Sequence, residues 1–321
     1  MKAAVVTSYG EPPRYADFPL PATLGEHEMI VDVLAAGLHR VVRSRASGAH
    51  YSADGTLPFV PGIDGVGRDP GGRLRYFIQQ DSTLGTMAEQ TVIDTRRSVV
   101  LPDGTDPVAV AAAVNPAMSS WLALRYRAGF TAGQDVLILG ATGSAGRMAV
   151  AAAQMQGARR IIAAGRDPQR LAALTEFGAG TRVSLAGSPD EAAERLASAA
   201  ADVDVVLDYL WGEPAAAAIT ALITARPDRG KPLSWVQIGS VAGATAAVPS
   251  AALRSAKFRI TGSGIGSVTA PEIIAELPGL AAAITSGSLR AEARPVPLAD
   301  VESAWTEPAD TIRRTVITPR S

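Results

Sequence analysis

Short apolar runs, broken repeatedly by Gly and Pro, mark the first hundred residues of the chain. Residues 2–6, 29–35, 87–94 and 98–102 carry the β-forming residues of strands. Turn-rich stretches such as GEPPRY, FPLPATLGEHE and ADGTLPFVPGIDG lie between them. This pattern predicts a mostly antiparallel β domain with long loops.

The period of the apolar positions changes after residue 106. Residues 107–129 predict a helix, an interruption at Asn115-Pro116 and a second helix. The runs DVLILG, RRIIAAG, VDVVLDYL and LSWVQIG then predict strands, separated by stretches of helical period. Strands that alternate with helices are typical of a parallel sheet covered on both faces.

The end of the chain resembles its start more than its middle. KFRITGSGIGS predicts a strand and a glycine loop, PEIIAELPGLAAAITSGSL a helix, and RPVPL and TIRRTVITP two more strands. We therefore expect an α/β protein with two domains. A doubly wound parallel sheet at 113–257 is inserted into a mostly β domain formed by 1–112 plus 258–321.

Composition narrows the class of protein. Hydrophobic residues make up 47% of the 321 residues and charged residues 19%, which excludes a disordered polymer. Thirty basic against 31 acidic residues leave no charge excess for nucleic acid or an anionic membrane. The absence of Cys excludes disulfides, thiolate nucleophiles and every Cys-ligated zinc site. No signal peptide or membrane span is evident, so we expect a cytoplasmic globular protein.

The run GATGSAG at 140–146 is the sharpest local signal, because it follows the strand DVLIL and precedes a helix. Glycines let the backbone approach a pyrophosphate, and the helix N-terminus offers free N–H groups and a positive dipole end. The alternative is a tight strand-to-helix turn without a ligand. The expected cofactor contacts are Gly140, Thr142, Gly143, Ser144, Ala145 and Gly146.

The end of the next strand indicates which dinucleotide the loop binds. A carboxylate about 20 residues on would bind the ribose 2′-hydroxyl of NAD. Gly165 stands at that position and Arg166 follows it. A guanidinium pairs with a 2′-phosphate, which favours NADPH, and Arg170 adds a second positive charge, although both arginines also suit an ordinary surface. We interpret Asp167 as the cap of the next helix, with Pro168 at its first position.

Taken together, these motifs resemble the zinc-free quinone oxidoreductase-like branch of the medium-chain dehydrogenase/reductase superfamily. The resemblance covers essentially the whole chain: MKAAVV, AAGLHRVVRSRASGAHY, LPFVPGIDGVG, GTMAEQTVI, LPDG and VLILGATGSAG stand in the family's order. It implies a GroES-like mostly β domain formed by both termini, a Rossmann domain inserted in the middle, and NADPH in the cleft between them. It also implies an assembly, for which we expect a homodimer.

The resemblance also bears on zinc. Zinc-dependent relatives carry a Cys within the AAGLHR segment and Gly-His-Glu where Gly62-Ile63-Asp64 stands, and a lobe with four Cys. Here Cys is absent and Ile63 replaces the His, so we expect no metal site. Without a Lewis acid the substrate must already be electrophilic, as quinones and α,β-unsaturated carbonyls are.

Two residues are the catalytic candidates that the resemblance indicates. His39 stands where quinone reductases usually have Asn, facing nicotinamide and substrate; it is a candidate donor to the ribose or carbonyl, or a proton donor. The alternative is a buried His satisfied by the backbone. Tyr51 is similar to an aromatic residue that lines the substrate cleft, and His50 competes with it for that position.

Further cofactor contacts follow from the same resemblance. Helix residues near the nicotinamide end are expected to be Asn115 with Ser119 or Ser120, and Tyr209 is expected near the adenosine side. Two loops that embrace the nicotinamide are expected at Gly239-Ser240 and at Gly264-Ile265-Gly266. The alternative roles are helix caps and plain turns.

The resulting hypothesis is an NADPH-dependent oxidoreductase that transfers hydride to a quinone or an α,β-unsaturated carbonyl without zinc. A zinc-free alcohol or ketone reductase and a non-catalytic NADPH-binding redox sensor are the alternatives. The expected partner is therefore a small-molecule quinone or enone, with no nucleic acid and no membrane.

Overall fold

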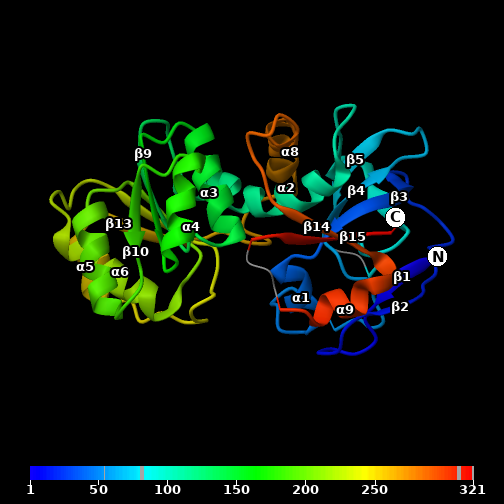
Figure 1. The fold of residues 1–321 in the computed structure, drawn as a ribbon, viewed down its shortest axis with the longest axis horizontal. Helices are drawn as coiled ribbons and strands as arrows, with labels where there is room; N and C mark the ends of the chain where they lie inside the picture. The colour runs from blue at the N-terminus through cyan, green and yellow to red at the C-terminus, as the bar shows by residue number, and fades with distance from the viewer. Residues whose placement is uncertain (54, 80–82, 309–311, 320–321) are drawn as a thin grey trace. The chain divides into compact units, whose positions relative to one another are not determined.

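The structure is a computed structural model that describes residues 1–53, 55–79, 83–308 and 312–319. The chain divides into two compact units (Figure 1). Unit 1 comprises Met1–Asn115 and Thr269–Ser321, and unit 2 comprises Pro116–Val268. Each unit is considered by itself below.

Unit 2 is a doubly wound sheet of parallel strands in the order β10-β9-β8-β11-β12-β13. The strands are β8 (Asp135–Leu139), β9 (Arg160–Gly165), β10 (Thr181–Ser184), β11 (Val205–Asp208), β12 (Leu233–Gln237) and β13 (Phe258–Gly262). The helices are α3 (Ser144–Met155), α4 (Pro168–Ala173), α5 (Pro189–Ala200), α6 (Gly212–Ala225) and α7 (Ser250–Ser255), with a 3₁₀ turn at Leu174–Phe177. The expected Rossmann-type alternation of strands and helices is confirmed.

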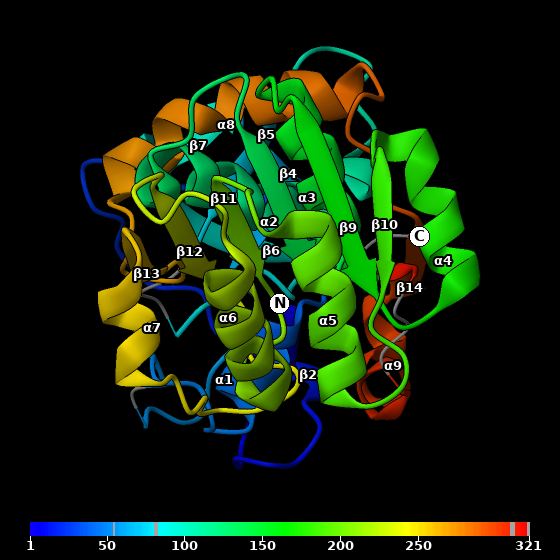
Figure 2. The ribbon, with the colours of Figure 1, turned by 90° about the vertical axis from the view of Figure 1, so that its left-hand side faces the viewer.

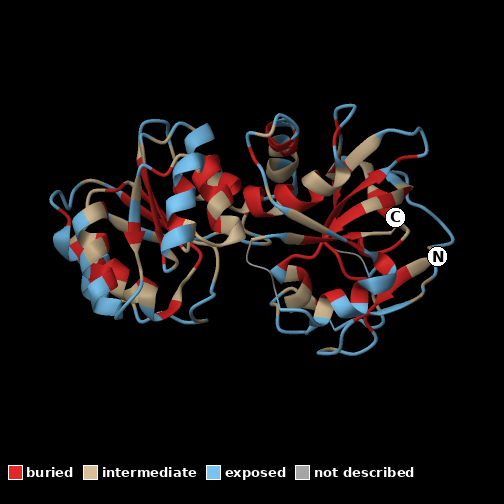
Figure 3. Cartoon of the chain, in the orientation of Figure 1, coloured by how far each residue is buried: buried red, intermediate tan, exposed pale blue. Residues whose placement is uncertain are grey.

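Both faces of this sheet are apolar, which is why its strands carry unbroken hydrophobic runs. In β8, Val136 and Ile138 pack with α3 in one buried cluster, whereas Leu137 and Leu139 pack with α5 and α6 in another. Figure 2 shows α5 and α6 lying across one face of the strands. The strands are buried while the outer side of α5 is exposed (Figure 3).

The described residues of unit 1 form two sheets. In the larger one the strand order is β14-β15-β3-β4-β5-β7, with β6 paired to β3, and only β14 and β15 pair in parallel among its described strands. The strands are β1 (Lys2–Val5) and β2 (Arg14–Asp17) of the smaller sheet, and β3 (Glu28–Gly37), β4 (Asp64–Arg68), β5 (Leu74–Ile78), β6 (Gln90–Asp94), β7 (Ser98–Val100), β14 (Ala293–Pro297) and β15 (Arg314–Thr318). The helices are α1 (Arg40–Ala46), α8 (Ala270–Thr285) and α9 (Val301–Thr306), with 3₁₀ turns at Thr95–Arg97 and Leu298–Asp300.

The boundary between the units differs from the expected one. Residues 258–268 were expected with the β-rich domain, but they lie in unit 2 because β13 pairs in parallel with β12. At the other junction, α2 (Pro107–Leu122) runs without interruption through Asn115-Pro116 and continues as a π-helical segment, Ala123–Ala128. A proline inside a helix removes one hydrogen bond. The apolar side chains around it are buried, among them Val114 and Ala117.

The stretch Pro107–Ala128 is also long and apolar enough to meet the length and composition criterion for a membrane span. Of its most apolar window, 72% is buried within the structure. A core helix of a protein has the same composition, and its burial here indicates that role.

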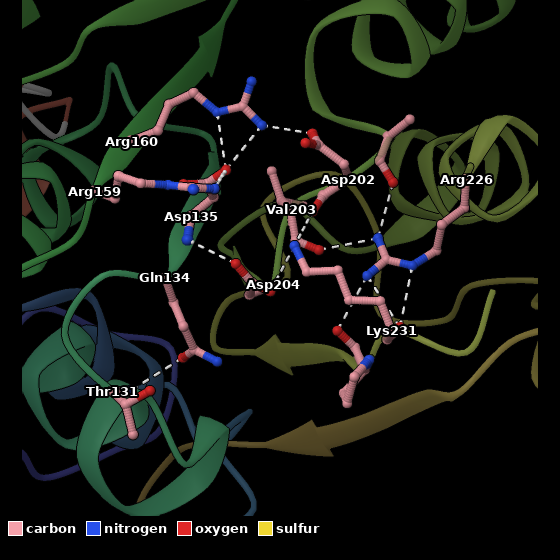
Figure 4. A network of polar contacts seen from close by, with 12 residues as sticks. Thr131, Gln134, Asp135, Arg159, Arg160, Asp202, Val203, Asp204, Arg226 and Lys231 are labelled. Carbon is pink, nitrogen blue, oxygen red and sulfur yellow. Dashed lines mark hydrogen bonds and ion pairs between the residues drawn. The ribbon is translucent and has the colours of Figure 1, made fainter. Parts of the chain in front are cut away.

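A network of ion pairs holds the amino ends of the strands in unit 2 (Figure 4). Buried Asp135, the first residue of β8, contacts the guanidinium groups of Arg159 at 2.8 Å and Arg160 at 3.0 Å. Burial alone would raise the pKa of Asp135, but the hydrogen bonds and charges of these two arginines outweigh it, so the pKa is lowered. Asp204 accepts the backbone N–H of Asp135 and pairs with Lys231 at 2.7 Å. These contacts lie at the opposite end of the strands from the glycine loop and serve the fold.

Candidate functional site

The glycine loop lies between β8 and α3, as the sequence predicts. Gly140 has φ +82°, a left-handed conformation that favours glycine, and its N–H and that of Ala141 donate to the carbonyl of Ala164 on β9. The N-cap of α3 is Gly143, which supplies no capping side chain, and the first turn has no acidic residue. No side chain at the N-cap therefore caps this helix N-terminus, whose backbone N–H groups and positive dipole end are of the kind that bind an anion.

Two other helices, α5 and α8, begin with side-chain caps. In α5, Ser188 and Glu191 form a complete capping box, and α8 has the same arrangement with Thr269 and Glu272. These side chains satisfy the N-terminal N–H groups that an anion would otherwise bind. The N-cap of α3 is a glycine, which has no side chain to bond these N–H groups. Helices that bind phosphate have N-termini of this kind.

Two glycines allow the close approaches that shape the loop. A Cβ at residue 146 would lie 2.3 Å from the carbonyl oxygen of Gly140, and a Cβ at residue 165 would lie 2.5 Å from Cγ2 of Thr142. Gly146 thus lets α3 pack against the strand turn, and Gly165 makes room for Thr142. The same contact leaves no space at residue 165 for the carboxylate that would bind a ribose 2′-hydroxyl.

Two arginines, Arg166 and Arg170, follow β9. Arg166 is exposed, and no described residue forms an ion pair with it. Asp167 accepts the N–H groups of Gln169 and Arg170 as the N-cap of α4, and Pro168 occupies the first turn, so the interpretation of Asp167 as a cap is confirmed. Arg170 pairs with Asp167 at 3.2 Å. Asp167 is therefore engaged by α4 and by Arg170, and the phosphate-binding role of Arg166 stays a prediction.

The turn after β11 packs against the glycine loop. Buried Asp208 accepts the N–H groups of Leu210 at 2.8 Å and Trp211 at 3.0 Å, and its second oxygen accepts the indole N–H of Trp235 at 3.0 Å. Burial raises the pKa of Asp208, although these hydrogen bonds act in the opposite direction. A Cβ at Gly140 would lie 3.0 Å from Cδ2 of Leu210, so the turn that Asp208 shapes lies directly against the loop.

The two serine candidates differ in exposure, and both lie near the hydroxyl of Tyr209. The hydroxyl of Ser119 is half-buried and lies 3.2 Å from the hydroxyl of Tyr209. Ser120 is fully buried and donates to the carbonyl of Ala117, as an ordinary helix hydroxyl does. Burial raises the pKa of Tyr209 to about 12, so its hydroxyl stays protonated. Tyr209 and Ser119 thus form a hydroxyl pair, and Asn115 is half-buried one turn earlier in α2.

The two expected nicotinamide loops differ in their surroundings. Gly239 donates its N–H to the carbonyl of Asp208, and a Cβ there would lie 2.8 Å from the carbonyl oxygen of Tyr209, so this loop joins the same group. Ser240 is exposed. In the loop after β13, Ser267 accepts the N–H of Gly264, Ile265 is half-buried and Gly266 has φ +89°. The cofactor roles of these residues stay predictions.

In unit 1, His39 lies at the N-cap of α1 with its ring buried. Its Nε2 is 3.0 Å from Oδ1 of Asp64, the first residue of β4, and the hydroxyl of Tyr76 on β5 donates to Oδ2 of the same carboxylate at 2.7 Å. A Cβ at residue 37 would lie 2.3 Å from Nε2 of His39, so Gly37 makes room for the ring. The partner of His39 is therefore a buried carboxylate, not the backbone.

Tyr51 lies in the loop after α1 and is 72% exposed. Its ring centroid is 4.1 Å from that of His50, whose Nδ1 is 2.7 Å from the hydroxyl of Ser52. Both candidates for the substrate-lining position therefore occupy one loop. The ring of His50 pairs with a hydroxyl of that loop, whereas the ring of His39 pairs with the carboxylate of Asp64.

Sequence reasoning missed three members of these groups. The sequence assigned none of Asp64, Tyr76 and Asp208 its present role. Their only sequence signals are a carboxylate and a tyrosine in strands that were not predicted, and an aspartate at the end of an apolar run. Within the described part of the chain, no three His, Cys, Asp or Glu side chains gather as metal ligands would.

Comparison with known proteins places the chain among relatives of one kind, although no family model matches it. It is 32% identical to a probable NADPH-dependent quinone reductase of Emericella nidulans, over 99% of this chain and 100% of that one. It is 30% identical to a quinone oxidoreductase of Pongo abelii, over 52% of this chain and 54% of the relative.

Solved structures agree with this grouping. The quinone oxidoreductase of Thermus thermophilus, solved alone and with NADPH, matches with a TM-score of 0.81 and 25% identity, over 99% of this chain and 100% of that one. An alcohol dehydrogenase superfamily protein of Novosphingobium aromaticivorans shares the fold, with a TM-score of 0.83 at 22% identity over the whole of both chains. The chain belongs to the quinone oxidoreductases of the medium-chain dehydrogenase/reductase superfamily.

Proposed function

We propose that this chain transfers hydride from NADPH to a quinone or an α,β-unsaturated carbonyl, without a resident zinc ion. The observation that carries the proposal is the glycine loop before the uncapped N-terminus of α3, with Gly165-Arg166 at the end of the adjacent strand. The relatives named for NADPH-dependent quinone reduction support it.

The residues of unit 2 fit such a cofactor. The N–H groups of the first turn of α3 would hold the pyrophosphate, and the guanidinium of Arg166 would hold the 2′-phosphate. When bound, NADPH supplies the hydride. The protein's part is to position the cofactor, and Asp208 contributes by fixing the turn on which the loop rests.

The proposed substrate class follows from the zinc ligands that this chain lacks. The chain contains no Cys, and Ile63 occupies the position where zinc-dependent relatives carry His. Zinc would polarise a simple carbonyl as a Lewis acid. A chain without those ligands suits substrates that accept hydride unaided, such as quinones and enones. We extend the proposal to a homodimer, to be tested by size-exclusion chromatography with light scattering, and to a cytoplasmic location, to be tested by cell fractionation.

The test is the initial rate of NADPH oxidation, with NADH in parallel, against one quinone, one enone and one simple ketone, each with and without a chelator. Chelator-insensitive turnover of the quinone or the enone that prefers NADPH is the expected result. Ketone turnover that disappears on chelation would overturn the zinc-free mechanism. Tight NADPH binding without turnover of any of the three would instead favour a redox sensor.

A further inference from the structure

The strand order of unit 2 assigns the two halves of a dinucleotide to different strands. The chain runs outward from β8 to β9 and β10 on one side and from β11 to β12 and β13 on the other. A dinucleotide lies across such a reversal, outside the carboxyl ends of the strands. The glycine loop follows β8 and Arg166 follows β9, so the phosphates and the adenosine belong to that side. The nicotinamide half then belongs to the ends of β11, β12 and β13.

Gln237 is the last residue of β12 and lies between the ends of its two neighbouring strands. In the strand register it is opposite Asp208 of β11 and Gly262 of β13. Its side-chain Nε2 donates to the carbonyl oxygen of Gly239 at 3.0 Å, and its own carbonyl oxygen accepts the N–H of Ser263 at 2.8 Å. Gln237 therefore holds the chain that follows β12 and the chain that follows β13.

The N–H groups of residues 238–242 show what the side chain of Gln237 contributes. Those of Ile238 and Gly239 donate to the carbonyl of Asp208, and those of Val241 and Ala242 donate to carbonyls of the turn after β11. The N–H of exposed Ser240 has no acceptor among the residues that the structure describes. This N–H group is therefore available to a ligand or to water.

The direction of that N–H depends on the carbonyl bonded to it. The carbonyl of Gly239 and the N–H of Ser240 belong to one peptide group, which is planar and trans, so the two point in opposite directions. The bond from Nε2 of Gln237 holds the carbonyl and thereby fixes the direction of the N–H. Without that bond the peptide group could rotate, because the N–H itself has no protein partner here.

We propose that Gln237 is a positioning residue, which orients the N–H of Ser240 to donate to the carboxamide oxygen of the nicotinamide. The proposal rests on the proposed function, and every contact that carries it lies within unit 2. A bond made in advance reduces the entropy that binding would otherwise cost. Gln237 should therefore contribute to the affinity for the nicotinamide half of NADPH and not to the affinity for its adenosine half.

The loop after β13 should not respond to a change of this side chain. Gln237 holds Ser263 through its backbone carbonyl, which every substitution retains. Farther along the loop, the hydroxyl of Ser267 accepts the N–H of Gly264 at 2.8 Å, and the N–H of Ser267 donates to the carbonyl of Gly264 at 3.0 Å. The effect of a substitution at residue 237 should thus arise at Gly239-Ser240.

The experiment uses Gln237→Met, which keeps the length of the side chain and removes its amide. The matched control is Gln154→Met, which alters an exposed glutamine near the end of α3, far along the helix from the glycine loop. Calorimetry measures the binding of NADPH and of adenosine 2′,5′-bisphosphate, which lacks the nicotinamide. We expect Gln237→Met to weaken NADPH binding about 3- to 10-fold and to leave bisphosphate binding unchanged. The control should change neither affinity.

A second variant, Gln237→Glu, keeps the shape of the side chain but replaces the donor with an acceptor. An ionised carboxylate cannot donate to the carbonyl of Gly239 and repels it. We expect this variant to weaken NADPH binding more than Gln237→Met does, about 10- to 100-fold, again without an effect on the bisphosphate. A role in packing alone would leave Gln237→Met equal to the unaltered protein. Urea unfolding identifies the folded variants, and should one of the two not fold, the other decides.

The possible failures are distinguishable. Unchanged NADPH affinity in the folded variants would overturn the role of Gln237, as would an equal loss of affinity for NADPH and for the bisphosphate. An unaltered protein that binds NADPH but reduces neither quinone nor enone would overturn the proposed function. In that case the comparison of the two ligands would still decide the role of Gln237, because it measures binding and not turnover.

Discussion

The contact between Gly165 and Thr142 is the basis of a double-mutant test of the cofactor loop. An ideal Cβ at residue 165 would lie 2.5 Å from Cγ2 and 2.9 Å from Oγ1 of Thr142, but 3.3 Å from its Cβ. Gly165 does not have a left-handed backbone conformation, so alanine introduces no backbone strain there. The whole cost of Gly165→Ala therefore arises from Thr142, and removing Cγ2 and Oγ1 should relieve most of it.

We expect Gly165→Ala to lower the free energy of unfolding by about 1–3 kcal/mol, the usual cost of overpacking a dense site. In a Thr142→Ala background the same change should cost less than about 1 kcal/mol, which gives a coupling energy of about 1–2 kcal/mol. Urea unfolding of the four proteins measures this coupling. Gly165→Ala should also weaken NADPH binding, and Thr142→Ala should reduce that loss, because the displaced Thr142 belongs to the glycine loop.

Gly180→Ala is the matched control, since no atom lies within 4 Å of a Cβ at that position and its backbone is not left-handed. This variant should leave the free energy of unfolding unchanged or raise it slightly. The reasoning would be refuted if Gly165→Ala cost no more than the control, or if Thr142→Ala failed to reduce its cost.

Three further outcomes are expected. Arg166→Ala should weaken NADPH binding about 10- to 150-fold, equivalent to a charge-assisted contact of about 1.5–3 kcal/mol, and leave the affinity for NADH unchanged. The control Arg229→Ala, at the other end of the sheet, should change neither affinity. Fluorescence titration measures both affinities. Asp135→Asn should lower the free energy of unfolding at pH 7 by about 1–3 kcal/mol. The folded protein lowers the pKa of Asp135, so its ionised carboxylate stabilises the fold at any pH above the pKa that Asp135 has in the unfolded state. That stability is lost as the pH falls through the folded-state pKa, so urea unfolding at pH 7 and at acidic pH should show the difference shrinking. Tyr209→Phe should cost about 0.5–1.5 kcal/mol in thermal unfolding, since Ser119 keeps its bond to the carbonyl of Pro116; a larger loss would contradict this.

The position of the glycine loop in the candidate site could be predicted from the sequence because its determinants are local. Each of its features stands directly after a strand or at the start of a helix, so spacing along the chain alone locates it. These features are the glycine loop, Gly165-Arg166 and the cap at Asp167. The parallel sheet was predictable for a related reason, since its strands are buried on both faces and carry unbroken apolar runs.

The His39 network could not be predicted in the same way. It depends on pairing between β3, β4 and β5, and β4 has the sequence DGVGR, which two glycines make a poor strand by propensity. The structure gives the reason for those glycines. A Cβ at Gly65 would lie 3.0 Å from the carbonyl oxygen of Ala35, and one at Gly67 would lie 2.8 Å from that of Asp32. Close approach of neighbouring strands, a tertiary requirement, selects residues that locally favour a turn.

The sheet of unit 1 also imposes an order on synthesis. Residues of unit 2 are contiguous, so a ribosome completes them before it makes β15. Yet β15 pairs with the end of β3 at Ala36 and Gly37, and Thr315 accepts the N–H of Leu38, directly before His39. The nascent chain can therefore form its dinucleotide-binding sheet while the backbone that presents His39 still lacks its final strand. A chain interrupted before residue 314 should retain a foldable unit 2 but leave β3 with an unpaired edge, the kind of surface on which aggregation begins.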